Sequence, residues 1–121
     1  MNKRWIYHLS RHSDWQRAKT TGAYAGSVED AGDGFLHFST ASQVIESALK
    51  HRAGETGLIL LEVDARALGV DLKWEASRGG QLFPHLYGTL AVNVVVAEFD
   101  LPLGPDGTHI FPEMKDDWTQ A

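Results

Sequence analysis

Residues 34–40, Gly-Phe-Leu-His-Phe-Ser-Thr, constrain this chain most, because they combine the pattern of a strand with the start of a helix. Alternation along a strand would place three side chains on one face: Phe35, His37 and Ser39. Thr40 and Gln43 have the spacing of a capping box, which predicts a helix directly after the strand. A polar strand face beside a helix N-terminus can bind an anion or a ribose, so this stretch is a candidate site.

The composition favours one soluble domain. The 121 residues are 43% hydrophobic, enough for a core, and we expect a single domain over residues 1–121. Charged residues interrupt every apolar segment, and His8 and Ser10 cut short the apolar N-terminal part, so we expect neither a membrane span nor a signal peptide. The absence of cysteine excludes disulfides and thiolate chemistry. A net charge of −5 argues against general nucleic-acid binding, and we expect a cytoplasmic protein.

The other elements follow from alternation, apolar runs and turn residues. Strands are predicted over residues 4–10, 58–63, 70–75 and 90–101. Helices are predicted over residues 13–21, with Ser13 and Gln16 as a capping box, and from Thr40 to Gly54 or Gly57. The apolar run 58–63 indicates a strand covered on both faces, and the β-branched run 90–101 indicates a central strand.

The remaining segments are expected to be irregular. Residues 23–33 have the composition of a loop, with Tyr24 as its buried anchor. Pro84 makes residues 83–88 irregular or a sheet edge, and the tail from Pro112 is expected to be loosely held. Strands with two modest helices that do not strictly alternate indicate an α+β domain.

Three histidines lie on expected strand faces beside a second polar residue. The pairs are His8 with Ser10, His37 with Ser39, and His85 with Tyr87. Each histidine could simply complete hydrogen bonds in the core, but three such pairs favour a shared cleft. Imidazoles also bind zinc, copper and nickel, yet no close-spaced ligand motif supports a metal site and we expect none.

Glu75 is a candidate acid–base residue, because it follows Trp74 at the end of a predicted strand. Desolvation beside an aromatic wall would raise its pKa and suit it to proton transfer, while the alternative is an ordinary exposed glutamate. The loop Arg78-Gly79-Gly80 could bind phosphate, although a solvated loop is the simpler interpretation. The sequence has neither a Walker loop nor a dinucleotide fingerprint.

Four segments together resemble a bacterial family, domain of unknown function nine-fifty-two: residues 6–10, 34–40, 74–75 and 83–88. The resemblance covers nearly the whole chain. It implies an ADP-ribosyltransferase-like fold, in which a split or curved β-sheet with two modest helices forms a cleft for NAD.

Two motifs carry the resemblance to that superfamily. Tyr7-His8-Leu9-Ser10 is similar to the Tyr-His-Gly-Thr stretch of poly-ADP-ribosyltransferases and RNA 2′-phosphotransferases, and residues 34–39 are similar to the His-Val-His-Leu-Ser stretch of the latter. The resemblance implies that His8 contacts a ribose and that His37 lies by the nicotinamide or a substrate phosphate. Leu9 replaces a glycine that lets the ribose approach the backbone. No catalytic glutamate matches, which leaves Glu75 and Glu98 by elimination.

The resemblance therefore implies an enzyme that acts on NAD, ADP-ribose or a phosphate derivative, of the transferase, hydrolase or phosphotransferase type. The expected catalytic residues are His37 and Glu75, and the expected cofactor-binding residues are His8, Ser10, Ser39, His85 and Tyr87. One alternative is a non-catalytic module that binds a nucleotide or another small molecule on the same fold. Another is a protein-interaction domain whose tryptophans pack an interface. The sequence leaves the ligand and the oligomeric state open.

Overall fold

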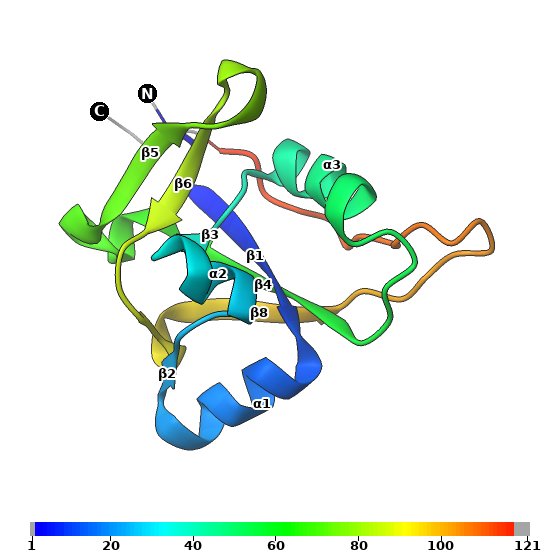
Figure 1. The fold of residues 1–121 in the computed structure, drawn as a ribbon, viewed down its shortest axis with the longest axis horizontal. Coiled ribbons are helices and arrows are strands. Elements are labelled where there is room, and N and C mark those ends of the chain that lie inside the picture. Colours follow the sequence, from blue (N-terminus) through cyan, green and yellow to red (C-terminus); the bar gives the residue numbers. More distant parts are fainter. Residues whose placement is uncertain (1, 118–121) are drawn as a thin grey trace.

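Two three-stranded antiparallel sheets form the frame of the computed structural model, which describes residues 2–117 apart from the side chain of Arg78 (Figure 1). The first sheet has the order β1-β4-β8: β1 Trp5–Arg11, β4 Leu58–Asp64 and β8 Val95–Asp100. The second has the order β3-β6-β5: β3 Leu36–His37, β6 Leu82–Leu86 and β5 Leu72–Ala76. A small third sheet pairs β2 Ala23–Tyr24 with β7 Leu90–Ala91.

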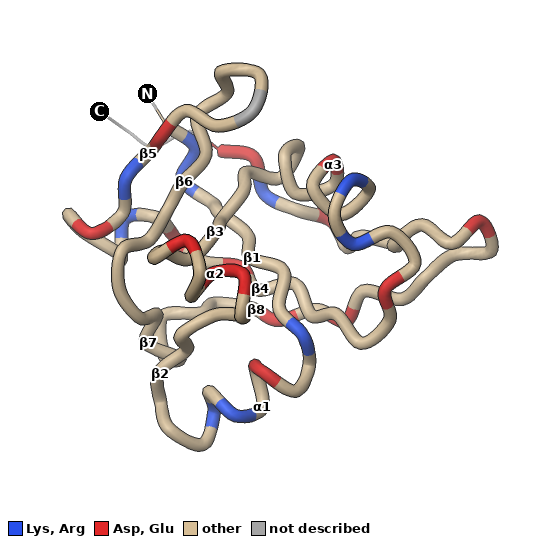
Figure 2. Tube along the Cα trace, viewed as in Figure 1, with Lys and Arg blue, Asp and Glu red and all other residues tan. Residues whose placement is uncertain are grey.

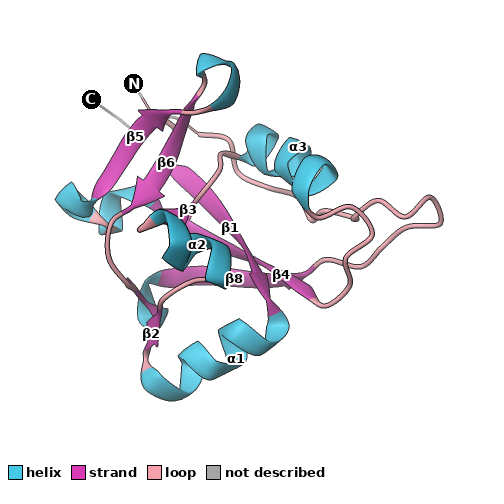
Figure 3. Cartoon of the chain, in the orientation of Figure 1, coloured by secondary structure: helices cyan, strands magenta, loops and turns pink. Residues whose placement is uncertain are grey.

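The two larger sheets meet where β1 passes the end of β3. Tyr7 and Ser39 form an isolated antiparallel bridge there, with N–H···O distances of 2.7 and 2.8 Å between their backbones. The bridge fixes β1 against β3, and the polar side chains of both strands consequently lie close together. The predicted α+β class is confirmed by this mixture of antiparallel sheets and helices (Figure 3).

Three α-helices lie in the described part of the chain: α1 His12–Thr21, α2 Val28–Asp33 and α3 Ala41–His51. Both halves of the predicted capping box form at the start of α3, between Thr40 and Gln43. The box predicted for α1 is wrong, because that helix begins one residue earlier, with Arg11 as an N-cap that makes no side-chain hydrogen bond. Gly22 ends α1 as predicted, with a left-handed φ of 86°.

The prediction of a loop over residues 23–33, and with it the expectation of only two helices, is wrong. Tyr24 is buried as expected, but it lies in a strand and not in a loop: β2 pairs with β7, which is distant in the sequence. The short helix α2 forms because Ser27 and Asp30 make a complete capping box. A helix this short depends on its cap and its tertiary contacts more than on intrinsic propensity.

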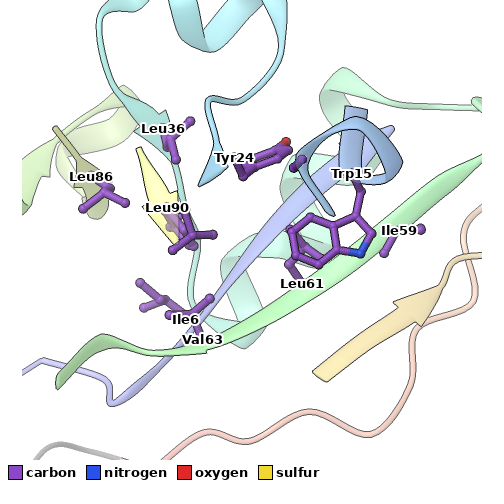
Figure 4. Packing of buried hydrophobic residues seen from close by; sticks show 11 residues of the cluster. Ile6, Trp15, Tyr24, Leu36, Ile59, Leu61, Val63, Leu86 and Leu90 are labelled. Carbon is purple, nitrogen blue, oxygen red and sulfur yellow. The ribbon is translucent and has the colours of Figure 1, made fainter. Parts of the chain in front are cut away.

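The core lies on both faces of the first sheet. Residues of β1 alternate between two apolar clusters, with Ile6 in one and Trp5 and Tyr7 in the other, which confirms the predicted alternation. The middle strand β4 is buried on both faces, as its apolar run predicts. Figure 4 shows the larger cluster, in which α1 contributes Trp15 beside residues of β4. The smaller cluster is covered by α3.

The apolar stripe of α3 is narrower than its sequence suggests. Val44 and Ala48 are each 1% exposed, whereas Ile45 and Leu49 are 42% and 53% exposed. The helix also ends at His51, before either glycine that was expected to stop it. Glu46 and Lys50 form an i,i+4 ion pair on the solvent side, at 2.7 Å.

Two expectations about strands are wrong. β6 is the middle strand of its sheet despite Pro84, whose carbonyl accepts a 2.9 Å hydrogen bond from the Phe38 amide. A proline is tolerated there because it lacks only the backbone N–H, and its carbonyl still takes part in the hydrogen bonds between the strands. The run 90–101 is not one central strand: β7 is followed by a 3₁₀ turn at Val92–Val94, and β8 lies at the sheet edge. Residues of β8 alternate in burial accordingly.

The end of the described chain is also held more firmly than predicted. The Lys115 amide donates to the Tyr7 hydroxyl at 2.8 Å, and the Arg4 amide donates to the Asp117 carbonyl at 2.8 Å. Lys115 also forms a 3.3 Å ion pair with the buried Glu62. Residues 111–117 therefore close the smaller cluster. Among the described helices, none has both the length and the apolar character that crossing a bilayer requires.

Candidate functional site

An open groove of about 930 Å³ brings the polar faces of both larger sheets together. Its lining comes from β1, α2, the β3 segment, α3, the loop before β6 and β6 itself. Four of the predicted site residues line it: His8, His37, Ser39 and His85. Phe35, His37 and Ser39 all line the groove, as the predicted alternation requires, and Leu36 is buried away from it, but Phe38 also lines the groove although it is only 1% exposed.

The centre of the groove is an aspartate–histidine pair that sequence reasoning missed. Asp30, 4% exposed, accepts hydrogen bonds from the His37 ring Nδ1 at 2.6 Å and from the His37 amide at 3.0 Å. Its other carboxylate oxygen accepts from the amide and hydroxyl of Ser27, at 2.8 and 2.9 Å. The second ring nitrogen of His37, Nε2, lies 2.9 Å from the carboxylate of Asp33. Asp30 therefore caps α2 and orients His37 with the same side chain.

This arrangement favours the charged form of both partners. The hydrogen bond to Asp30 raises the pKa of His37 above its ordinary value of 6.5, and the nearby Asp33 acts in the same direction. Burial alone would raise the pKa of Asp30, but hydrogen bonds from His37 and Ser27 hold that pKa well below its ordinary value. The two carboxylates therefore favour the imidazolium form of His37, in which both ring N–H groups donate to carboxylates.

His8 is bonded internally through both ring nitrogens. Its Nδ1 lies 2.6 Å from the backbone oxygen of His37, so Nδ1 carries a proton and donates. Its Nε2 lies 2.7 Å from the hydroxyl of Tyr24, which therefore donates to it. Burial lowers the pKa of His8, which is 3% exposed, and keeps the ring neutral. His8 holds β3 in place through the His37 carbonyl, and its contact with a ribose stays a prediction.

A second polar cluster lies at the β5–β6 end of the groove. The Nδ1 of His85 lies 2.8 Å from Oε1 of Glu75, and the Tyr87 hydroxyl donates to the same oxygen at 2.7 Å. The expected raised pKa of Glu75 is wrong, because the hydrogen bonds from Tyr87 and His85 lower it. Glu75 and Tyr87 do not line the groove themselves; they hold His85, which does.

Phe35 connects the two clusters. Its ring stacks on His85 with a centroid distance of 4.1 Å and an interplanar angle of 27°. It also lies 4.6 Å from the His37 ring, and the two histidine rings are 5.7 Å apart. The structure therefore brings His37 and His85 together over one aromatic residue.

Two further candidates lie away from the groove. Ser10 is 1% exposed, and its hydroxyl donates to the Arg11 carbonyl at 3.0 Å. Glu98 on β8, considered by elimination, accepts a 2.8 Å hydrogen bond from the Trp15 indole and pairs with Lys19. Neither lines the groove.

The charges around the groove are largely paired. Acidic residues cluster on α2, while α3 carries both signs (Figure 2). Arg52 lies 3.4 Å from Glu55 and 4.0 Å from Glu29, and Lys50 pairs with Glu46. Within residues 2–117, no three side chains of His, Asp or Glu are arranged to hold a metal ion.

The signals for the missed residues are weak but present in the sequence. Ser27 and Asp30 have the spacing of a capping box, and an aspartate serves less often than glutamate at its second position. That spacing would have indicated α2, but it gives no indication that the same carboxylate reaches His37. This contact depends on how α2 packs against β3.

Folding stability should be highest near pH 6.5, because the pKa values of His8 and His37 are shifted in opposite directions. The pKa of His37 is raised in the folded state. The stabilisation that this shift gives the fold is therefore complete below 6.5, the pKa of His37 in the unfolded chain, and it is lost as the pH rises through the pKa of the folded state. The pKa of His8 is lowered in the folded state. The stabilisation that this shift gives the fold is therefore complete above 6.5, the pKa of His8 in the unfolded chain, and it is lost as the pH falls through the pKa of the folded state.

Urea unfolding at intervals from about pH 5 to about pH 9 would measure this dependence. In the variant His37→Asn, which keeps a donor for Asp30 but cannot be charged, the decline above pH 6.5 should be much reduced. An unchanged decline in that variant would assign the effect to other groups.

The fold and the groove define a class: small α+β domains in which a polar, histidine-bearing groove lies between two antiparallel sheets. The chain belongs to the family described as "protein of unknown function (DUF952)", whose model matches residues 9–98.

The chain is similar to the crystal structure of protein CC0527 from Caulobacter crescentus, with 47% identity, a TM-score of 0.85, and coverage of 88% of this chain and 93% of that one. The solution NMR structure of CC0527 gives 48% identity and a TM-score of 0.78, covering 86% and 90% of the respective chains. A comparison with curated proteins gave no match.

Proposed function

We propose that the groove binds a ribose nucleotide of the NAD or ADP-ribose type, and that the protein acts on this ligand as an ADP-ribosyltransferase-like enzyme. The observation that carries the proposal is His37, whose ring is oriented within the groove, and whose imidazolium form is favoured, by the buried Asp30. The Nε2 N–H of this ring bonds the exposed Asp33, and a phosphate that takes the place of that carboxylate would accept a charge-assisted hydrogen bond from it.

The size and the walls of the groove also support a nucleotide. A volume of about 930 Å³ lies toward the upper end of the range for small-molecule sites, about 300–1,000 Å³. Phe35 and the ring of His85 offer an aromatic surface against which a base or a nicotinamide could stack. The polar groups of His37 and Ser39 would fix the orientation of a ribose.

A non-catalytic nucleotide-binding module is the second candidate, and one observation favours it. Glu75, the expected catalytic carboxylate, is bonded to His85 and Tyr87 and does not line the groove. Both proposals require saturable binding, and they differ only in turnover. Release of nicotinamide from NAD, followed by chromatography, therefore separates them.

Binding can be tested by titrating NAD, ADP-ribose and ATP against isotopically labelled protein while the histidine ring signals are followed by NMR. We expect the signals of His37 and His85 to shift together and to saturate with NAD or ADP-ribose. The variant His37→Asn, which retains a donor for Asp30, should bind at least about tenfold more weakly if the ring charge contributes about 1.4 kcal/mol or more.

The matched control is His12→Ala, since His12 lies on α1 and does not line the groove. It should bind with the affinity of the unmodified protein. If none of the three nucleotides moves the ring signals of His37 or His85, the groove is not a nucleotide site.

A further inference from the structure

Two buried polar atoms of the groove bond no residue in the described part of the chain: the hydroxyl oxygen of Ser39 and Nε2 of His85. Both residues line the groove, and both are 8% exposed. The backbone of Ser39 is bonded to Tyr7 in both directions, but its hydroxyl is not bonded. Nδ1 of His85 lies 2.8 Å from Glu75, which leaves Nε2 without a bond. Because buried polar groups in proteins are nearly always bonded, these two atoms point to a partner that a ligand supplies.

Both atoms are accessible from the groove. Among the described buried side chains, the indole nitrogen of Trp5 is the one nitrogen or oxygen that is fully covered and also unbonded. The Ser39 hydroxyl and Nε2 of His85 are therefore not fully covered, and the groove is the space that both residues line. The other buried polar side chains that line it are bonded within the fold: Tyr7, His8, Ser27 and Asp30.

Strand pairing places the two atoms on one patch of the groove wall. His37 on β3 pairs with His85 on β6. The Phe38 amide donates to the Pro84 carbonyl at 2.9 Å and continues this register by one pair. Ser39 therefore lies diagonally across from His85, on the face that lines the groove. Diagonal neighbours on antiparallel strands lie about 7–8 Å apart, with their Cβ atoms somewhat closer, so one small group can bond both side chains.

The chemistry of the two atoms selects hydroxyl groups as their partners. A serine hydroxyl both donates and accepts. Nε2 of His85 accepts when the ring is neutral and donates when the ring is charged. A ligand hydroxyl can bond the ring in either state, whereas a phosphate or carboxylate oxygen can bond only the charged ring. Two neighbouring hydroxyls, one for each atom, would satisfy both.

We propose that Ser39 and His85 bind the vicinal 2′- and 3′-hydroxyls of a ribose, so that the groove prefers a ribose to a deoxyribose. This inference rests on the nucleotide proposed above for the same groove, and it names the part of that nucleotide that these strands recognise. The ribose is the one whose attached ring lies against Phe35, because Phe35 stacks on His85 with a centroid distance of 4.1 Å.

A ribose at this position agrees with a phosphate at His37. The rings of His37 and His85 lie 5.7 Å apart, which is short enough for one nucleotide to reach both. The preference for ribose follows from burial: a ligand that lacks one hydroxyl leaves a buried group of the site unpaired, and sites built around a substrate hydroxyl discriminate strongly for this reason.

The test compares NAD with two analogues by isothermal titration calorimetry. One analogue lacks the 2′-hydroxyl of the adenosine ribose, and the other lacks the 2′-hydroxyl of the nicotinamide ribose. We expect one of them to bind at least about tenfold more weakly than NAD. The other should bind with an affinity close to that of NAD, since only one ribose can lie on Ser39 and His85.

Two variants connect this preference to the residues. Ser39→Ala removes the hydroxyl, and His85→Phe removes Nε2 but keeps an aromatic ring beside Phe35. The ratio of the affinities for NAD and for the weaker analogue should fall to near one in the variant whose residue bonds the 2′-hydroxyl. A general loosening of the fold would weaken both ligands and leave this ratio unchanged. Ser13→Ala is the matched control, because Ser13 is exposed on α1 and does not line the groove, and it should keep the full ratio.

The outcomes separate this proposal from the previous one. If NAD binds and neither analogue binds more weakly, or if both variants keep the full ratio, the diol site is refuted and the nucleotide groove stands. If NAD does not bind, methyl β-D-ribofuranoside tests the diol site alone, through the His85 ring signals in NMR spectra. Shifts with this sugar, and none with its 2-deoxy analogue, would support the diol site and refute the nucleotide. If neither sugar shifts these signals, both proposals fail.

Discussion

The variant Asp30→Ala should lose about 3–5 kcal/mol of the free energy of unfolding, because it removes one partner of a buried, charged hydrogen-bond network. The Asp30 carboxylate accepts from two backbone amides, the Ser27 hydroxyl and the His37 ring. Alanine would leave the amides of Ser27 and His37 without that acceptor in a buried setting, and each unsatisfied donor costs about 1–3 kcal/mol. Equilibrium unfolding in urea measures the loss directly.

Asp33→Ala is the matched control for this experiment. Asp33 bonds the other ring nitrogen of His37, but its side chain is 58% exposed. Exposed ion pairs contribute about 0–1 kcal/mol, so this variant should remain close to the unmodified protein. Equal losses in the two variants would contradict the central structural role of Asp30.

Trp15→Ala should be similarly costly, with an expected loss of about 3–5 kcal/mol from the cavity left by a large core side chain. Trp15 is 1% exposed, belongs to the larger cluster, and lies with its ring centroid 5.9 Å from that of Tyr24. Tyr24 donates to Nε2 of His8, so looser packing around Tyr24 should also shift the His8 ring signals. Urea unfolding and histidine NMR spectra would measure the two effects.

Two phenylalanine variants refine this result. Trp15→Phe keeps most of the ring but loses the indole N–H that donates to Glu98 at 2.8 Å, whereas the indole nitrogen of the buried Trp5 has no hydrogen-bond partner in the described chain. Trp5→Phe should therefore be tolerated better than Trp15→Phe. A larger loss at Trp5 would show that its ring packing, beneath Arg4 and Lys115, outweighs the hydrogen bond of Trp15.

Local patterns predict much of this fold because they act over a few residues. The alternation of β1, the two-sided burial of β4 and the cap of α3 all follow from short stretches. The predictions fail where distant segments decide the outcome. β6 is central although it contains Pro84, and β2 exists only because β7 pairs with it.

The candidate site divides in the same way. Strand alternation identifies His37 and His85 as residues of one polar surface, and the structure places both in the groove. The carboxylates that bond their rings, Asp30 and Glu75, come from other elements, and their contacts depend on the packing of α2 and β5. Ser10 was included because it shares a strand face with His8, but its position near the start of α1 buries it away from the groove.

The bridge between Tyr7 and Ser39 has a mechanical consequence. Within the described residues it supplies the backbone hydrogen bonds that join the two larger sheets, so a single antiparallel bridge links their backbones. Side chains reinforce this rung, because residues of both sheets share the larger apolar cluster and the His8 ring donates to the His37 carbonyl, so opening of the groove would have to separate these contacts as well. The exchange of the Tyr7 and Ser39 amide hydrogens with deuterium therefore measures how often the junction between the two sheets opens.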